Sequence, residues 1–459
     1  MSKIAFIPID NRPVCYDLPK MVANLNKDNE IYLPDISLLG DLKNIANIKE
    51  IFSWLSNLST IDVVVVCLDT IAYGGLIPSR RSVENIEEIK NRIDLFFKIV
   101  SKKNAKVYAF SSVMRISNNN INEEEKEYWN NYGEKIFKYS YDLHRLGLNH
   151  GELICDIPVE IIEDYLKTRE RNFGINKYYI ELKKQGLIDT LVFSKDDCAQ
   201  FGLNVKEAQE LISLSKDDEN ILVKTGADEI PVTLLSRALN KDKKVKIAPV
   251  YMQEESINKI SKYEDISVED SVKSQIELSG GIVSNIENCD LILLVNNFKN
   301  QQGELVMNVS EPLCEKQIPK FDKPFFVADI LNANGADNNF VENLIKEKLD
   351  KFYGYSAWNT TGNTLGSAIS SALTYFTATF RDEEIFEKLQ VVRFLDDWAY
   401  QANVRAEIRN EKANLQNGII YSKMKDFENI ILEKFNNKGI KIKYSYPWNR
   451  FFEIRVDIN

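Results

Sequence analysis

The stretch Val63-Val64-Val65-Val66-Cys67-Leu68 decides the fold that this sequence predicts. A continuous apolar run of this length is typical of a strand buried on both faces, as in parallel sheets. Similar short runs recur along the chain at residues 4–8, 107–110, 191–193, 221–223, 245–250, 291–295 and 325–328. Helical patterns separate most of them, for example at residues 83–100, 205–213 and 341–349. Because strands alternate with helices, we expect an α/β protein with parallel strands.

Two architectures fit this alternation. We prefer a TIM-like parallel barrel over residues 1–378, because eight to ten candidate strands would close a barrel with little left over. The alternative is two Rossmann-like three-layer domains. A polar, Asn-rich helical insertion is expected at about residues 116–186. Residues 379–459 are expected to form a small α+β appendage that ends in two alternating strands, at 440–444 and 452–456.

Composition excludes several classes of partner. The 459-residue chain has a formal net charge of -10 and no segregated basic patch, so we expect neither a nucleic-acid nor an anionic-membrane partner. The first residues lack the pattern of a signal peptide, and no apolar stretch reaches the length of a membrane span. Six single cysteines without a C-x-x-C pair are typical of reduced thiols, so we expect a cytoplasmic location.

Polar residues follow the apolar runs, where parallel α/β folds bind ligands. Acidic residues in these loops would bind substrate hydroxyls. Arginines there would form bidentate hydrogen bonds with a carboxylate or phosphate. Alternatively, the arginines could serve only to balance the negative charge of nearby aspartates. The candidate substrate-binding residues after the first three runs are Asp10, Arg12, Asp69, Tyr73, Arg80 and Arg115.

Asp196 and Asp197 form the most specific pair, directly after the run at 191–193. Two adjacent carboxylates repel each other, so one can hold a proton while the other stays charged. Glycoside cleavage needs this division between a proton donor and a charge stabiliser, and we assign both residues catalytic roles. The structural alternative is that one caps the next helix and the other is solvated.

Further polar loops suggest a carbohydrate ligand. Asp228 and Glu229 follow the next run and could bind sugar hydroxyls, or could instead begin a helix. Side-chain amides beside a tryptophan suit a neutral polyol, because the ring stacks on a sugar face while the amides bind hydroxyls. The alternative is a capped helix with the tryptophan in the core. The candidates in these loops are Asn334, Asp337, Trp358, Asn359 and Asn363.

Cofactor motifs are missing from the sequence. It contains two histidines, no G-x-x-x-x-G-K-[ST] and no G-x-G-x-x-G after the first run, so we expect no metal, nucleotide or other organic cofactor. A hard cation such as Mg²⁺ remains an alternative if Asp10, Asp69 and Asp196 converge. That arrangement would favour a metal-dependent hydrolase.

Taken together, these motifs resemble the bacterial family of unknown function DUF4127 over about residues 1 to 450. The resemblance rests on residues 8–15, 68–80, 114–115, 196–197, 226–229, 334–337 and 358–364, and the family implies no activity. Gly226-Ala227-Asp228-Glu229 is also similar to the Gly-Gly-Asp-Glu of family 20 hexosaminidases, and Asp196-Asp197 looks like the catalytic pair of family 84 hexosaminidases. In those enzymes one carboxylate orients the acetamido group and its neighbour donates a proton.

The sequence therefore predicts a glycoside hydrolase acting on a small, possibly N-acetylamino, sugar. Two alternatives remain: a non-catalytic carbohydrate-binding or sensing protein, and a metal-dependent hydrolase.

Overall fold

The computed structural model describes residues 2–153, 156–196, 199–309, 317–410, 418–435 and 439–458. The chain divides into two compact units. The first unit comprises Met1–Asn11 and Glu30–Pro231, and the second comprises Arg12–Asn29 and Val232–Asn459. An early segment of the chain therefore belongs to the unit that is otherwise built from the C-terminal half.

The first unit is built on a six-stranded sheet with the order β2-β1-β3-β4-β5-β6. The pairings from β1 through β6 are all parallel. Every residue of β3 is buried, as expected for a central strand covered on both faces. The strands are β1 (Ser2–Ile7), β2 (Asn29–Tyr32), β3 (Val63–Cys67), β4 (Lys106–Val113), β5 (Thr190–Lys195) and β6 (Ile221–Thr225).

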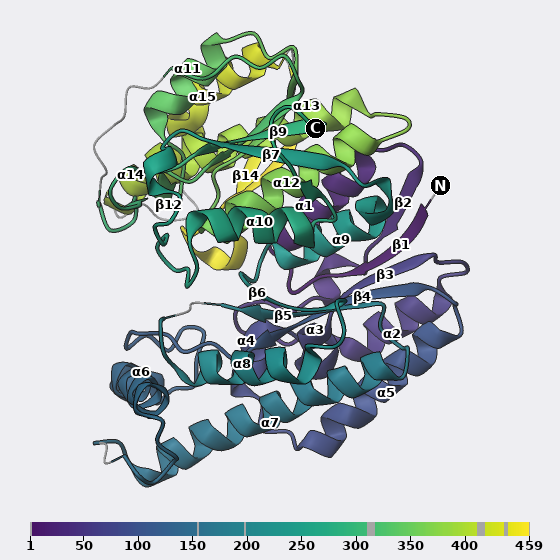
Figure 1. Ribbon diagram of the computed structural model, residues 1–459, viewed down its shortest axis with the longest axis vertical. Coiled ribbons are helices and arrows are strands. Elements are labelled where there is room, and N and C mark those ends of the chain that lie inside the picture. The colour runs from purple at the N-terminus through teal and green to yellow at the C-terminus, as the bar shows by residue number, and fades with distance from the viewer. Residues whose placement is uncertain are drawn as a thin grey trace. The chain divides into compact units, whose positions relative to one another are not determined.

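Helices α5, α7 and α8 lie side by side along one face of this sheet (Figure 1). The region expected as a helical insertion contains α6 and α7, which share a small apolar core. The helices of the unit are α2 (Ile48–Asn57), α3 (Leu68–Tyr73), α4 (Leu76–Arg81), α5 (Ile86–Ser101), α6 (Trp129–Leu146), α7 (Val159–Lys184) and α8 (Leu203–Ser215), with a 3₁₀ turn at Ile36–Leu38.

The second unit contains a five-stranded parallel sheet with the order β13-β11-β9-β7-β8. Its strands are β7 (Lys246–Tyr251), β8 (Ile282–Val283), β9 (Leu291–Asn296), β11 (Phe325–Asp329) and β13 (Phe352–Ser356). Two small sheets accompany it. One pairs β10 (Gly303–Glu304) with β12 (Asn332–Ala333), and the other is an antiparallel pair, β14 (Ile442–Ser445) with β15 (Arg455–Ile458).

Both sheets share one strand order. When the strands of each unit are counted along the chain, the first five read 2-1-3-4-5 in both units. This order is common in doubly wound α/β sheets. The direction in which successive strands are added to the sheet reverses between the first and third strands. Among the described residues the protein is thus an α/β fold with two open parallel sheets, and the preferred TIM-like barrel is not confirmed. The physical reason is that each sheet has two unpaired outer strands, whereas a barrel requires its first and last strands to pair.

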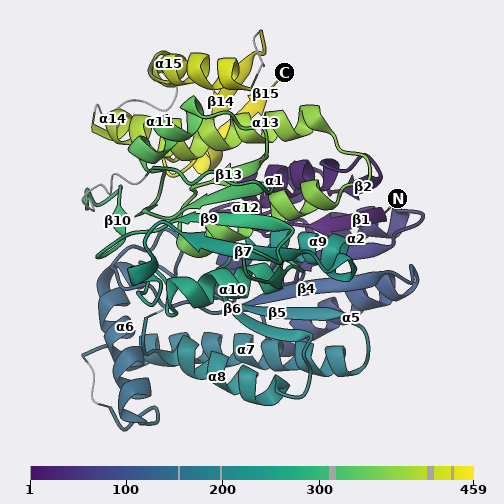
Figure 2. The same cartoon turned by 45° about the horizontal axis from the view of Figure 1, so that its top comes forward.

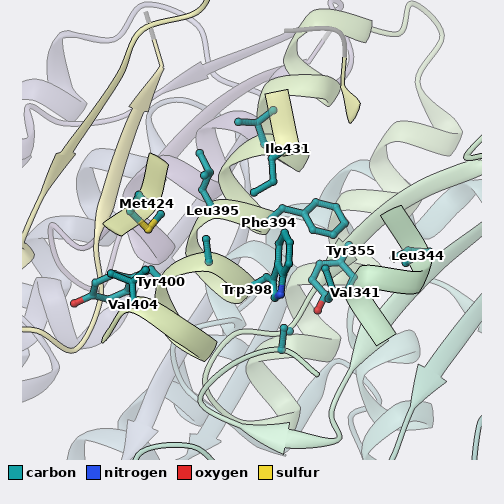
Figure 3. Packing of buried hydrophobic residues seen from close by; sticks show 14 of the residues in the cluster. Val341, Leu344, Tyr355, Phe394, Leu395, Trp398, Tyr400, Val404, Met424 and Ile431 are labelled. Atoms are coloured by element: carbon teal, nitrogen blue, oxygen red, sulfur yellow. The ribbon is translucent and has the colours of Figure 1, made fainter. Parts of the chain in front are cut away.

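The C-terminal segment shares a core with the second sheet. The ring of Tyr355 stacks on Phe394 with centroids 4.6 Å apart, and Trp398 and Ile431 extend the same cluster (Figure 3). The helices α13–α15 and the β14–β15 pair lie together in the second unit (Figure 2). The boundary expected between residues 378 and 379 stays a prediction.

Helix α1 packs against α12 and α13 within the second unit. The Asp382 amide donates to the Leu25 carbonyl at 3.1 Å, and Arg455 pairs with Asp17 at 2.9 Å. The helices of the unit are α1 (Pro13–Asn24), α9 (Ile230–Asn240), α10 (Val268–Leu278), α11 (Asn338–Lys346), α12 (Thr361–Thr377), α13 (Glu383–Arg393), a π-helix (Phe394–Val404), α14 (Arg405–Asn410) and α15 (Ile419–Lys434), with 3₁₀ turns at Lys241–Lys243, Glu254–Ser256 and Pro447–Asn449.

Within the described ranges, none of the helices combines the length and apolar character needed to cross a bilayer.

Candidate functional site

Asp69 follows β3 directly and begins α3. Its side chain is buried, and its Oδ2 accepts a hydrogen bond from the Ser112 amide at 2.8 Å. Burial raises the pKa of Asp69 to about 7, although the Ser112 hydrogen bond and the positive charge of Arg80 act in the opposite direction. A carboxyl group of this kind can hold or release a proton near neutral pH.

Glu125 links two arginines at the ends of neighbouring elements. Its Oε1 accepts from Arg80 Nη1 at 2.6 Å and from Arg115 Nε at 3.2 Å. Glu124 Oε2 lies 2.8 Å from Arg115 Nη2. The guanidinium of Arg80 is almost fully buried, so its carboxylate partner is needed to offset the cost of burying the charge. Neither glutamate was among the candidates predicted from the sequence.

Asp196 joins the same network from the end of β5. Its Oδ2 lies 3.5 Å from Arg115 Nη1, and 24 % of its side chain is exposed. A guanidinium this close favours the ionised form of a carboxyl group. Asp197, the second member of the predicted catalytic pair, lies outside the described residues. We call the network of Asp69, Arg80, Arg115, Glu124, Glu125 and Asp196 the strand-edge cluster.

Asp10 and Tyr73 lie in the same unit as this cluster. Asp10 is buried after β1, and Thr70 Oγ1 ties the two loops together by donating to the Pro8 carbonyl at 2.6 Å. Tyr73 is also buried, and its hydroxyl has no hydrogen-bond partner among the described residues. Burial raises the pKa of Tyr73, so the hydroxyl keeps its proton at neutral pH.

The loop after β6 is shaped by a glutamate that folds back onto it. Glu229 is fully buried, and its Oε2 accepts from the Ala227 amide at 3.1 Å. Gly226 has a φ of 118°, and a Cβ there would lie 1.7 Å from Glu229 Oε1. Only glycine therefore fits. Asp228 is buried as well, immediately before α9.

The second unit contains its own carboxylate cluster at the ends of β9, β11 and β13. Asn296 Nδ2 donates to Asp329 Oδ1 at 2.9 Å and to Asp337 Oδ2 at 3.3 Å. The Tyr355 hydroxyl donates to Asp329 Oδ2 at 2.9 Å. Burial, together with the charge of Asp337, raises the pKa of Asp329 to about 7, and burial also raises the pKa of Asp337. Of these residues only Asp337 was a sequence candidate.

The π-helix contributes further acids to this unit. Asp397 Oδ2 accepts from the Ala357 amide at 2.7 Å and from Ser356 Oγ at 3.3 Å. Arg393 lies 3.2 Å from Asp397 and 3.3 Å from Asp396. Burial raises the pKa of Asp397 to about 7. π-Helical turns are rare and often lie at functional sites, but nothing in the local sequence distinguished this one from an ordinary charged helix.

The Asn and Trp candidates stabilise loops of the second unit. Asn334 and Asn359 both adopt positive φ, at 65° and 61°, and the Asn334 amide donates to the Asn359 carbonyl at 2.7 Å. Asn363 is buried in the first turn of α12. Trp358 is 1 % exposed and packs edge-on against Phe452 at a centroid distance of 6.3 Å. Its ring therefore has no open face for a sugar in this structure.

Arg12 precedes α1 and belongs to the second unit. Its guanidinium lies 4.8 Å from the centroid of the Trp448 ring. The predicted site residues are therefore divided: Asp69, Arg80, Arg115 and Asp196 come together in the first unit, whereas Arg12 and the Asn, Trp and Asp337 candidates belong to the second. Over the described part of the chain, no group of three or more His, Cys, Asp or Glu side chains is arranged to hold a metal ion.

Comparison with known families identifies a match over nearly the whole chain. A family model described as "Protein of unknown function (DUF4127)" matches residues 4–457. A search of curated proteins finds no match to this chain.

Proposed function

The chain belongs to the DUF4127 family, and we propose that it is a cytoplasmic glycoside hydrolase that binds a small, uncharged sugar at the strand-edge cluster of the first unit. One observation carries the proposal: a partly exposed Asp196, paired with Arg115, shares a network with the buried Arg80, and burial raises the pKa of the neighbouring Asp69 to about 7. The strand order supports a Rossmann-like first unit, in which ligands bind at the carboxyl ends of strands. The buried free thiols of Cys15, Cys67 and Cys289 support a reducing compartment.

The charges of the cluster favour an uncharged substrate. The guanidinium groups of Arg80 and Arg115 face the carboxylates of Glu124, Glu125 and Asp196, so the acids outnumber the bases. An anionic substrate would have to displace one of these carboxylates and leave it unpaired. We therefore assign the arginines to positioning the acids, instead of to binding an anionic substituent.

The two aspartates after β5 take different roles in this proposal. Asp196 is paired with Arg115 and accepts a hydrogen bond from the substrate, for example from an acetamido N–H. Asp197 donates a proton to the leaving oxygen, a role supported by its position in the sequence next to Asp196. The fully buried Glu229, bound to its own loop, is assigned a structural role.

The test compares two substrates that differ in how much they need a proton donor. One is the 4-nitrophenyl N-acetylglucosaminide, whose leaving group is stable as an anion, and the other is an N-acetylated disaccharide, whose leaving sugar must be protonated. Losing a general acid costs about 10²–10⁴ in rate. Asp197→Asn should therefore slow disaccharide cleavage by about that factor and aryl glycoside cleavage much less. Asp196→Asn should slow both to a similar extent.

The matched control is Asp217→Asn, an exposed aspartate of the same unit, which should leave both rates unchanged. If wild-type protein binds sugars but cleaves none of a broad panel of glycosides, the hydrolase proposal fails and the carbohydrate-binding alternative holds. If cleavage disappears on chelation and returns with Mg²⁺, the metal-dependent alternative holds.

A further inference from the structure

A wide cleft lies on the first unit, and its lining residue Arg81 donates to the Glu125 carbonyl of the strand-edge cluster at 3.1 Å. It has a volume of about 1030 Å³ and is bounded by the loop at residues 41–49, helix α2, helix α4 and helix α5. We propose that this α2–α5 cleft binds an anionic amphiphile, a compound with an apolar chain and a carboxylate or phosphate head. The proposal goes beyond the hydrolase activity and is independent of it.

The 41–49 loop forms a preformed wall of the cleft, held in place by contacts within the protein. The Ala46 amide donates to the Gly74 carbonyl at 2.9 Å. A Cβ on Gly74 would lie 2.9 Å from Ile45 Cβ, and one on Gly40 would lie 2.6 Å from the Gly74 oxygen. The two glycines therefore allow the loop to press against the turn between α3 and α4. Asp41 Oδ1 fixes the loop internally by accepting from two of its amides, at 2.7 and 2.8 Å.

Several exposed apolar side chains gather in the cleft. Val83, Ile45 and Leu95 line it and are 89 %, 67 % and 49 % exposed. Scattered exposed apolar residues need no explanation, but these three gather around one concavity with Ile77 and Phe52. Its volume and lining match those of small-molecule sites, which are mostly apolar with a few polar groups that orient the ligand.

The charged groups of the cleft determine whether it favours a negatively or a positively charged head group. Lys43 and Lys49 are exposed, and the charge of Lys43 helps to lower the pKa of Asp41. Of the two acids in the lining, Glu84 is paired with Arg92, and Asp41 is bound by its own loop. Because the lining also includes Arg81, its basic groups outnumber its acids, and the cleft carries net positive charge on a chain whose net charge is -10. This local reversal favours a negatively charged head beside an apolar body.

Tyr73 contributes an aromatic ring to the cleft wall. It is 4 % exposed, and the Arg171 guanidinium lies 5.4 Å from its ring centroid. Because the hydroxyl itself has almost no accessible surface, we assign recognition of the head group to the lysines.

The experiment measures binding of decanoate and decyl phosphate to the full-length protein by isothermal titration calorimetry. The neutral comparison is decanol, which has the same chain. Both anions should bind more tightly than decanol, and the double variant Lys43→Glu/Lys49→Glu should weaken the anions by about tenfold while leaving decanol unchanged. Leu95→Asp should weaken all three ligands, because it places a charge in the apolar wall.

Two surface variants serve as controls. Lys102→Glu reverses an exposed lysine at the end of α5, and Ile212→Asp places a charge at a comparably exposed apolar position on α8. Neither should change binding. The proposal is overturned if decanol binds as tightly as decanoate, or if the double variant retains full affinity. It is also overturned if the protein binds phosphatidylglycerol vesicles but neither free anion, because the groove would then be a membrane contact instead of a ligand cleft.

Discussion

Replacing Asp69 with asparagine removes a buried ionisable group while keeping its shape. The amide oxygen of the new side chain can still accept the hydrogen bond from the Ser112 amide. In the wild-type protein, burial raises the pKa of Asp69 from 3.8 to about 7, so the folded state keeps a proton that the unfolded chain has lost. Between these two values the folded state binds more protons, and its stability therefore falls as pH rises.

The size of the effect follows from the pKa change. A rise from 3.8 to about 7 corresponds to about 4 kcal/mol in total, of which about 3 kcal/mol develops between pH 5 and pH 8. Asparagine cannot ionise, so Asp69→Asn should become progressively more stable than wild type over this range. For a unit of about 200 residues, the difference corresponds to about 6–12 °C in Tm.

The assay is thermal and urea unfolding of both proteins at several pH values from 5 to 8. The difference between the two proteins is the quantity of interest, because the pH dependence of Asp329 and Asp397 is common to both and cancels. The exposed Asp217→Asn should give a difference from wild type that does not vary with pH. Parallel pH curves for Asp69→Asn and wild type would refute the reasoning, since they would mean that Asp69 is charged throughout.

Three further substitutions test the local packing, each by urea denaturation. Gly226→Ala should destabilise the protein by about 2 kcal/mol or more, because the new Cβ meets the Glu229 carboxylate. Glu125→Gln should cost about 1–3 kcal/mol, because it leaves the buried Arg80 guanidinium with only the more distant Glu124 carboxylate, 3.8 Å away, as a charged partner. Tyr355→Phe should cost about 1–3 kcal/mol and raise the pKa of its carboxyl partner, because it removes a hydrogen bond that stabilises the carboxylate.

Each of these predictions has a contrasting case. Gly186→Ala also places alanine at positive φ but in open space, so it should cost only the backbone strain of about 1 kcal/mol. The double variant Arg80→Met/Glu125→Leu should be more stable than Glu125→Gln, because it leaves no unpaired charge. Wild-type stability in Gly226→Ala, or in Tyr355→Phe at every pH, would contradict the geometry described for those loops.

Local sequence patterns predicted most of the strands. They did not predict whether the strands close into a barrel or form open sheets. Every apolar run identified in the sequence lies in a parallel strand, because burial on both faces leaves a local signature. The strands missed were β2, β8, β10, β12 and β13, which are half-buried, two residues long, or interrupted by glycine. Whether strands close into one ring or form two open sheets depends on pairing between distant residues. The same list of runs therefore fits both folds.

The strand-end rule located part of the candidate site. The structure brings Asp69, Arg80 and Arg115 together beyond the ends of β3 and β4, and their assignment to substrate binding stays a prediction. The rule missed Glu125, which lies in a charged run typical of a solvated surface, although a buried arginine requires a carboxylate from somewhere in the chain. It could have found Asp329, which ends an apolar run directly.

The division of the candidates between two units had no local signal. Helix α1 follows β1 directly, yet it belongs to the unit whose sheet begins more than two hundred residues later.

This arrangement has a consequence during synthesis. Helix α1 is made before residues 30–231 of the first unit, but its partners α12 and α13 are made only after them. At about 5–20 residues per second, the intervening residues 30–231 alone take about 10–40 s to appear. Through that interval the apolar face of α1, with Val14, Leu18 and Val22, has no docking surface of its own unit. Until α12 and α13 appear, the nascent chain therefore exposes an apolar segment to which a chaperone that recognises short apolar helices would bind.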